Sequence, residues 1–185
     1  MDAHDTGSAT LAGGCFWCLE AVFEQVEGVE KVVSGYSGGD VIQPSYRQVC
    51  SETTGHAEAV QITFDSEIIS YDQILDIFFA IHDPTTLNRQ GYDVGASYRS
   101  AIFFHSPEQK VAAENAIAAL DEAKTWSSAI VTEVTSLSGF YPAEDEHQQY
   151  YRKNNNAQYC QMIISPKLVK FRKEYLDKLK PAVST

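Results

Sequence analysis

The order in which strand-like and helix-like patterns alternate constrains the fold of this chain more than any other feature. Between residues 15 and 28 apolar side chains recur at helical spacing, and a second such pattern follows the capping pair Ser70 and Gln73. A third helix opens with Ser106 and Gln109, which also form a capping box. Strand-like stretches, which are β-branched or alternate in polarity, cover 9–14, 29–39, 56–65, 98–105 and 129–135.

The resulting order is β-α-β-β-α-β, followed by a helix, a strand and a tail. It predicts an α/β chain of the α+β two-layer plait type, with a ferredoxin-like β-α-β-β-α-β core and an added helix and strand. The C-terminal tail is expected to be long and loop-rich, with a mobile stretch over 154–160 and a basic amphipathic helix over 166–180. The polar loops 38–55 and 83–97 are long enough to suggest function. With 185 residues and no repeat, residues 1–185 are expected to form a single domain.

The charge balance excludes some partners. The net charge is −11 and the isoelectric point is about 4.8, which disfavours binding to a phosphate backbone, so no nucleic acid partner is expected. No apolar run has the length of a bilayer span, so no membrane partner is expected either. The polar, acidic start at residues 1–10 does not have the pattern of a signal peptide. We therefore expect a cytoplasmic protein, and a monomer.

The cysteines indicate thiol chemistry rather than a disulfide framework. Cys15 follows two glycines at the predicted start of a helix, where the helix dipole stabilises a thiolate. Cys18 lies one turn later on the same face, near enough to form a disulfide with Cys15. Cys160 lies in the tail, and Cys50 is expected to be a buried structural cysteine.

Several kinds of site remain open from these residues alone. Phe16 and Trp17, between the two thiols, suit an enzyme that binds a small apolar group beside its thiolate, although both rings also fit a protein core. A structural zinc site needs a second pair of ligands, and neither the remaining cysteines nor His56 and His147 show that spacing, so no metal is expected. A Cys–His hydrolase and a thioredoxin-like disulfide oxidoreductase are also compatible with these residues.

The sequence around the thiols resembles a known family. The stretch "GCFWCLE" is similar to the signature of peptide methionine sulfoxide reductase A, and four further segments resemble that family in its order: "SGYSGG", "PSYRQVCSETTGHAEAV", "HDPTTLNRQGYDVGASYRSAIFFHSPEQ" and "FYPAEDEHQQYYRKN". The resemblance runs from about Ala9 to beyond Phe171. It implies reduction of methionine-S-sulfoxide, free or in proteins, to methionine. It also implies thioredoxin as the external reductant, and no metal or organic cofactor.

The resemblance implies a role for each matching residue. Cys15 would attack the sulfoxide sulfur, and Glu58 would donate a proton as general acid. Because Glu58 falls on the apolar side of its predicted strand, a raised pKa is expected for its carboxyl. Tyr46 and Tyr98 match tyrosines that hydrogen-bond the sulfoxide oxygen. Asp93 matches an aspartate that helps to position the substrate.

The same resemblance implies a role for Phe16 and Trp17, which would form the apolar pocket for the methyl group on sulfur. The sulfenic acid left on Cys15 would be resolved by Cys18 or by Cys160, which matches a tail cysteine of many members. We favour Cys18 for the first step, because its reach does not depend on a loop moving. The non-enzymatic alternative is a redox-sensing or methionine-binding module, which would not need Glu58.

Overall fold

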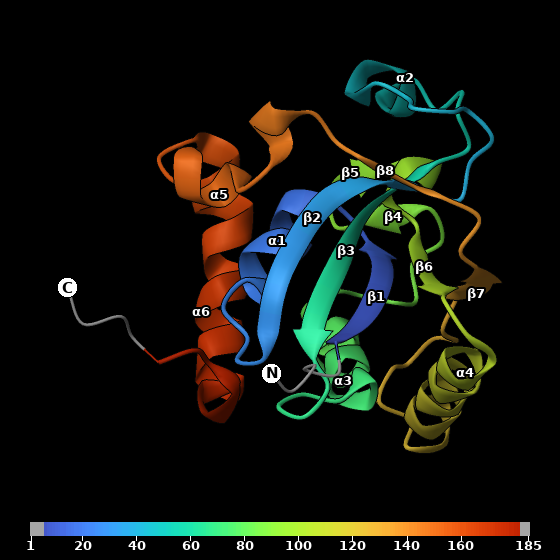
Figure 1. Cartoon of the computed structure of the whole chain (residues 1–185), viewed down its shortest axis with the longest axis vertical. Helices are drawn as coiled ribbons and strands as arrows, with labels where there is room; N and C mark the ends of the chain where they lie inside the picture. The colour runs from blue at the N-terminus through green and yellow to red at the C-terminus, as the bar shows by residue number, and fades with distance from the viewer. Residues whose placement is uncertain (1–5, 182–185) are drawn as a thin grey trace.

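Six strands form one sheet, and the larger part of the core lies on one face of it. The structure is a computed structural model that describes residues 6–181. The strand order is β7-β6-β1-β3-β2-β8, and Figure 1 shows α1 and α3 behind these strands. The strands are β1 (Thr6–Gly13), β2 (Val29–Ser37), β3 (Ala57–Asp65), β6 (Ser100–Phe104), β7 (Glu133–Ser136) and β8 (Phe140–Pro142).

The four central strands pair antiparallel, and only β7 runs parallel to its neighbour β6. In the register of these pairs Leu11 of β1 lies between Val60 of β3 and Ile102 of β6, while Glu58 of β3 lies opposite Tyr36 of β2. The mixed α/β class predicted from the sequence is therefore confirmed. The helices are α1 (Phe16–Phe23), α2 (Tyr46–Cys50), α3 (Tyr71–Ile81), α4 (Pro107–Glu122), α5 (Tyr150–Lys153) and α6 (Ser165–Glu174).

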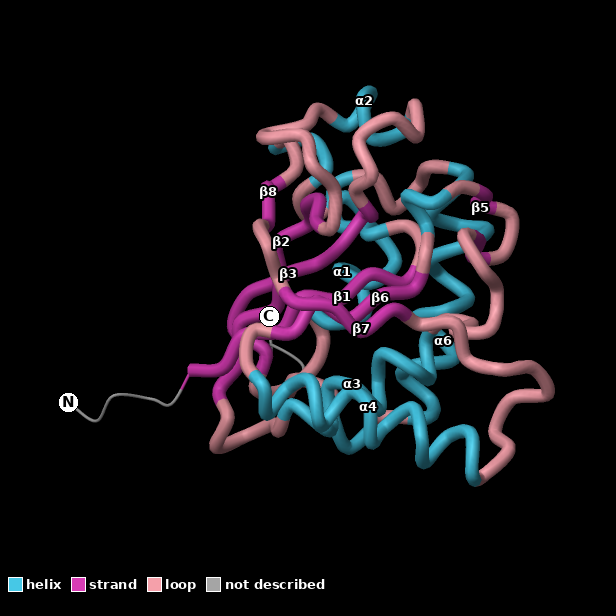
Figure 2. Tube along the Cα trace, turned by 90° about the vertical axis from the view of Figure 1, so that its right-hand side faces the viewer, coloured by secondary structure: helices cyan, strands magenta, loops and turns pink. Residues whose placement is uncertain are grey.

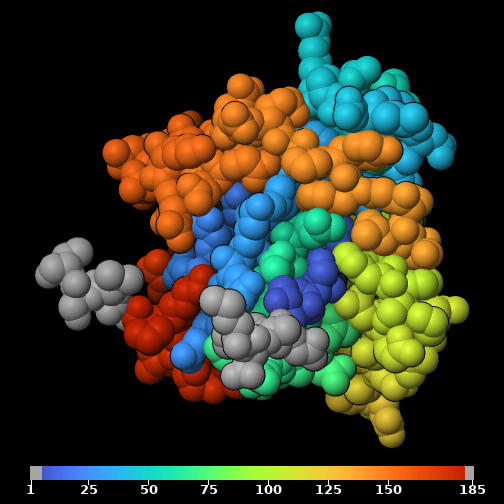
Figure 3. Space-filling model, viewed as in Figure 1, coloured from blue at the N-terminus to red at the C-terminus, as the bar shows by residue number. Residues whose placement is uncertain are grey.

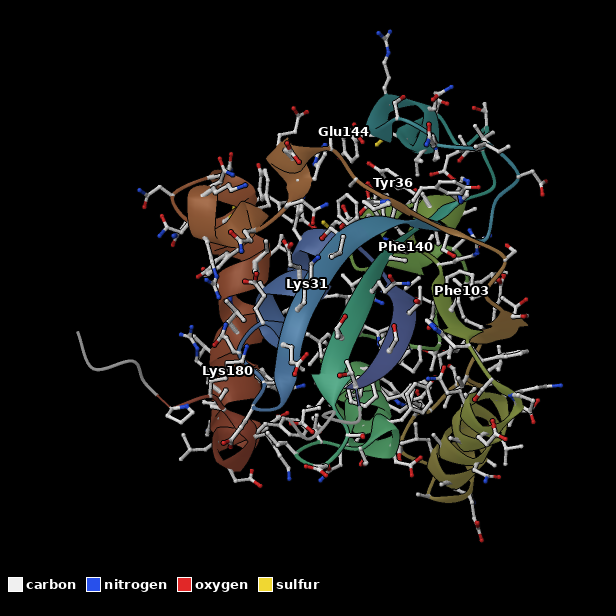
Figure 4. All side chains as sticks on the ribbon, in the orientation of Figure 1. Lys31, Tyr36, Phe103, Phe140, Glu144 and Lys180 are labelled. Atoms are coloured by element: carbon white, nitrogen blue, oxygen red, sulfur yellow. The ribbon has the colours of Figure 1, made fainter. Side chains whose placement is uncertain are left out.

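The two faces of the sheet bury different kinds of side chain. The helix-covered face holds large residues of α1, α3 and α6, among them Phe23, Phe78 and Phe171. The opposite face is lined by alanines of β1, β3 and β6 together with Phe103, and Leu137 and Phe140 pack against it. Figure 2 shows α3 and α4 lying side by side below the strands, and Figure 4 labels Phe103 and Phe140. Burial of the large apolar side chains places the main hydrophobic stabilisation on the helical side.

The predicted helix starts are largely confirmed. Ser70 accepts a hydrogen bond from the Gln73 N–H, and the Gln73 side chain accepts one from the Ser70 N–H, so the capping box of α3 is complete. At α4 only half of the predicted box forms, because the side chain of Gln109 accepts from the His105 N–H instead. Helix α1 ends at Phe23, earlier than the apolar spacing predicts.

Both long loops contain short elements. Helix α2 lies within 38–55, and the hairpin of β4 (Arg89–Gln90) and β5 (Asp93–Val94) lies within 83–97, followed by the 3₁₀ turn Ala96–Tyr98. The strand predicted over 129–135 begins only at Glu133, and the sequence pattern does not predict β8. These strands are short and half-exposed, so their sequences show little periodicity.

The tail holds more helix than the loop-rich tail that the sequence predicts. After turns at 154–157 the chain enters a π-helical turn at Cys160–Ile164 that continues into α6, and α6 ends at Glu174. Leu168 and Phe171 of α6 are buried in the same core cluster as α1, and Figure 3 shows the orange and red C-terminal residues directly beside the blue N-terminal ones. The prediction about a signal peptide concerns residues 1–10, and residues 1–5 lie outside the part of the chain that the structure describes. Within 6–181, no helix is long and apolar enough to cross a membrane.

Candidate active site

Cys15 lies where β1 turns into α1, and the turn requires glycine. Gly14 has a φ of +91°, a left-handed conformation that favours glycine. A Cβ added at Gly14 would lie 2.6 Å from Cγ of Gln90, whose side chain is held by hydrogen bonds to the backbone of Asp83. Cys15 then serves as the N-cap residue of α1 and is 7% exposed. The glycine therefore lets the loop containing Gln90 close directly over the turn that carries Cys15.

The two thiols of the CxxC motif are hydrogen-bonded to each other. Burial, more than any other effect, raises the pKa of Cys15 well above its usual value, although the hydrogen bond of Tyr159 opposes that rise. The Cys15 hydrogen bond instead lowers the pKa of Cys18 to about 7. Burial therefore acts against the thiolate that the helix N-terminus is predicted to favour on Cys15. Of the two thiols, Cys18 has the lower pKa.

Glu58 lies next to this turn with its carboxyl buried. Its side chain is 1% exposed, and its Oε2 accepts a hydrogen bond of 3.0 Å from the N–H of Phe16. Burial raises the pKa of Glu58 to about 8, with smaller contributions from the charges of Asp93, Cys18 and Glu52. The direction agrees with the expectation from the strand pattern. At neutral pH this carboxyl holds a proton that it is able to donate.

Two tyrosine hydroxyls belong to the same site. Tyr46 is the first residue of α2, and Tyr98 ends the 3₁₀ turn. Burial and the nearby charge of Glu58 raise the pKa of both phenols, which keeps both hydroxyls protonated as hydrogen-bond donors. The sequence positions of these residues are far apart, and the fold brings both phenols to Glu58.

Aromatic rings surround the first turn of α1. Phe16 is fully buried, and its ring lies 6.3 Å from that of Tyr46 in a stacked arrangement. Trp17 is partly buried and stacks on Tyr150, with ring centroids 3.6 Å apart and planes inclined by 7°. The ring of His147 lies 4.2 Å from that of Tyr46. The sequence pattern indicates Phe16 and Trp17 but not the rings that pack against them from the C-terminal segment.

Asp93 is linked to the two thiols by Tyr159, which the sequence pattern does not indicate as a site residue. The Tyr159 hydroxyl donates a hydrogen bond of 2.8 Å to Oδ2 of Asp93 and also contacts both thiols. A pocket of about 220 Å³ opens beside them, and its lining includes Cys15, Cys18, Asp93 and Tyr159. The only local signal for Tyr159 is its position directly before Cys160.

The two remaining cysteines differ from their predicted environments. Cys160 is fully buried at the start of the π-helical turn, and the charge of Cys18 contributes to raising its pKa after the effect of burial. Cys50, expected to be buried, is exposed at the end of α2. Among residues 6–181, no group of three or more His, Cys, Asp or Glu side chains is placed to hold a metal ion.

The site places two thiols, which are able to supply electrons, beside a buried carboxyl that is protonated at neutral pH. It is the site of a thiol-dependent oxidoreductase.

Comparisons with known proteins agree with this class. The family model for peptide methionine sulfoxide reductase matches residues 7–180. The peptide methionine sulfoxide reductase MsrA of Leptospira borgpetersenii is 61% identical over 165 residues, which cover 89% of this chain and 93% of the relative. The MsrA of Saccharolobus solfataricus is 56% identical over 172 residues, covering 93% and 96%. The reduced form of Mxr1 from Saccharomyces cerevisiae is 32% identical, covers 86% of this chain and 91% of its own, and gives a TM-score of 0.77.

The chain therefore belongs to the peptide methionine sulfoxide reductase family. Its activity is the thiol-dependent reduction of methionine sulfoxide.

Proposed function

We propose that this protein repairs methionine-S-sulfoxide, free or in proteins, with Cys15 as nucleophile and Glu58 as general acid. The observation that supports this assignment best is the buried carboxyl of Glu58, which bonds to the first N–H of α1 directly after Cys15. Because a sulfoxide oxygen is a poor leaving group, attack on sulfur needs a proton donor at the oxygen. A carboxyl with a pKa of about 8 supplies that proton at neutral pH.

The reaction balances without a metal or an organic cofactor. Cys15 passes its proton to the Cys18 thiolate and attacks the sulfoxide sulfur, while Glu58 protonates the oxygen. Attack forms a bond between the two sulfurs. That bond and the S–O bond of the substrate then break as the hydroxyl passes to the Cys15 sulfur, so that methionine leaves reduced by two electrons and Cys15 becomes a sulfenic acid. Tyr46 and Tyr98 donate hydrogen bonds to the oxygen as negative charge develops on it. Asp93, held by Tyr159, positions the rest of the substrate.

Resolution of the sulfenic acid follows from the arrangement of the thiols. Cys18 attacks Cys15, which releases water and forms a disulfide; its hydrogen bond to Cys15 supports this order. Cys160 is the second resolving thiol, and its burial means that the helical turn around it must open first. Thioredoxin, oxidised in exchange, returns the enzyme to its reduced form. The yeast protein Mxr1 has also been solved in complex with Trx2.

A single turnover without added reductant tests this function. Wild type, Cys18→Ser and Cys160→Ser are each mixed with a methionine-S-sulfoxide substrate, methionine is counted per enzyme, and disulfides are mapped by mass spectrometry. We expect methionine from all three proteins, a Cys15–Cys18 bridge in Cys160→Ser, and in wild type a Cys18–Cys160 bridge once the second step has taken place. A wild type that forms no methionine, yet exchanges disulfides through its CxxC motif, would instead be a thioredoxin-like oxidoreductase.

Trp17→Ala is expected to lower kcat/KM for methionine sulfoxide by about tenfold or more, mainly through KM, because it removes an apolar wall from the methyl-binding pocket. Steady-state kinetics with methionyl and dimethyl sulfoxides measure this loss. Trp126→Ala is the control, since Trp126 lies in the loop after α4, outside this ring cluster. Equal kinetics for Trp17→Ala and wild type would refute the pocket assignment.

We also propose the finer features of the fold and its setting. The order β6-β1-β3-β2, with α1 and α3 as the connecting helices, supports a ferredoxin-like plait in a single domain. Four free cysteines support a reducing compartment, the cytoplasm. The acidic net charge of −11 supports a protein without nucleic acid or membrane partners, and we propose that it acts as a monomer.

A further inference from the structure

The segment Glu144–Tyr150, here called the strap, crosses the edge of β2 and reaches α1. It begins at Glu144, whose carboxylate accepts hydrogen bonds of 3.1 Å from the Tyr36 hydroxyl and 3.1 Å from the Tyr46 N–H. Figure 4 shows Glu144 and Tyr36 close together near the end of β2. The middle of the strap is fixed by Gln148, whose side-chain amide bonds to both the N–H and the C=O of Ser34 at 3.0 and 2.7 Å.

The far end of the strap is fixed by one buried carboxylate. Glu20 of α1 is 1% exposed, and it accepts hydrogen bonds of 2.8 Å from the Gln149 N–H and 3.3 Å from the Tyr150 N–H. Gln149 adopts a left-handed conformation with a φ of +53°, which few residues apart from glycine adopt readily. Burial raises the pKa of Glu20 to about 7, and the two N–H groups oppose that rise because they stabilise the ionised carboxylate.

The strap brings two rings to the active-site cluster. Tyr150 lies flat on Trp17 at 3.6 Å, and His147 lies against Tyr46 at 4.2 Å. Trp17 is one of the two rings that the proposed function assigns to the methyl group of the sulfoxide. The position of Trp17 therefore depends on Tyr150, whose backbone is held by Glu20.

The geometry points to Glu20 as a positioning residue for substrate binding: it fixes the strap, and through Tyr150 it fixes the Trp17 wall of the sulfoxide pocket. This inference rests on the proposed function, because the role of the wall comes from that proposal. Glu20 accepts its hydrogen bonds from the backbone of the strap, at Gln149 and Tyr150. Its effect on substrate binding is therefore expected to depend on the strap rather than on a direct contact with the thiols or with Glu58.

A double-mutant cycle tests this route. Glu20→Gln and Tyr150→Leu are made singly and together, with Glu24→Gln as the matched control. Glu24 lies one turn further along the chain; its side chain is 12% exposed and bonds at 2.9 Å to the side chain of Arg152 rather than to the backbone of the strap. Steady-state kinetics use methionine sulfoxide, and circular dichroism and melting temperature confirm that each variant is folded. Glu20→Asp, which keeps the charge but shortens its reach, replaces Glu20→Gln if the latter is unfolded at the assay temperature.

We expect Glu20→Gln to lower kcat/KM by about tenfold through KM, because the amide has only one oxygen to accept from the two N–H groups, and loss of a buried hydrogen bond costs about a factor of ten. In the Tyr150→Leu background the same change should cost at most about twofold, as should Glu24→Gln in the wild type. Equal losses from Glu20→Gln in both backgrounds would overturn the inference.

Trp17 fluorescence supplies a readout that needs no substrate. In a Trp126→Phe background Trp17 is the one tryptophan of the chain, since the sequence has two. Glu20→Gln should shift its emission as Tyr150→Leu does, and Glu24→Gln should leave it unchanged. If the emission of Glu20→Gln is unchanged, the inference is wrong, whatever the activity of that variant. If the wild type does not reduce the sulfoxide, the proposed function is wrong, and the emission still reports whether Glu20 positions Trp17.

Discussion

Cys15→Ser is expected to lower the rate of methionine sulfoxide reduction by at least about 10³-fold, because a serine hydroxyl neither attacks sulfur effectively nor forms a stable sulfenic acid. Serine is close in size, so the N-cap position and the burial at the start of α1 are kept. The measurement is methionine formed in a single turnover, which does not depend on recycling.

Cys50→Ser is the control for Cys15→Ser. Cys50 is exposed at the end of α2 and has no role in the proposed reaction, and a serine there is able to keep the hydrogen bond to Tyr46. The control should keep the wild-type rate within about twofold, as expected of a surface substitution. A Cys15→Ser rate within about tenfold of wild type would remove Cys15 from the role of nucleophile.

Glu58→Gln is expected to lower kcat by about 10²- to 10⁴-fold while KM changes little, because the amide cannot protonate the sulfoxide oxygen. The amide oxygen is still able to accept the Phe16 N–H that Glu58 accepts at 3.0 Å, so the turn before α1 should persist. Glu67→Gln, at an exposed carboxyl after β3, is the control. Unimpaired turnover in Glu58→Gln would show that the proton comes from another group, and would favour a site in which Glu58 only caps α1.

The pH dependence of kcat gives a second measure of the same carboxyl. The pKa of Glu58 is raised to about 8, so the carboxyl is protonated below that pH and loses its proton above it. The wild-type rate should therefore fall as the pH rises through about 8, and this alkaline limb should be absent in Glu58→Gln. Because Cys18 has a pKa of about 7, both proteins should lose rate as the pH falls below that value.

The parts of the site that the sequence predicts are those with local signals. Gly13 and Gly14 before a CxxC motif predict a turn into a helix, and the structure has that turn at Cys15. Strand alternation places Glu58 among apolar side chains, and its raised pKa follows from the burial that this pattern predicts.

The parts that the sequence does not predict depend on contacts between distant segments. Glu20 has the appearance of an ordinary helix carboxylate until residues about 130 positions later donate to it. The sequence predicts a mobile stretch at Tyr159 and Cys160, yet packing of α6 on α1 buries Cys160 completely. Cys50 is exposed because α2 lies at the surface, which no periodicity in five residues reveals.

The closing of the strap and α6 over α1 has a consequence for how the protein is made. A chain leaves the ribosome from its N-terminus, so Cys15 and Cys18 emerge long before the residues beyond Glu144 that enclose them. Strands β1, β2, β3 and β6 are all synthesised earlier than the strap, whereas the buried thiol environment needs nearly the full length of the chain. During translation both thiols are therefore open to oxidants in the surrounding solution, and enclosure of the active site is a late event in biosynthesis.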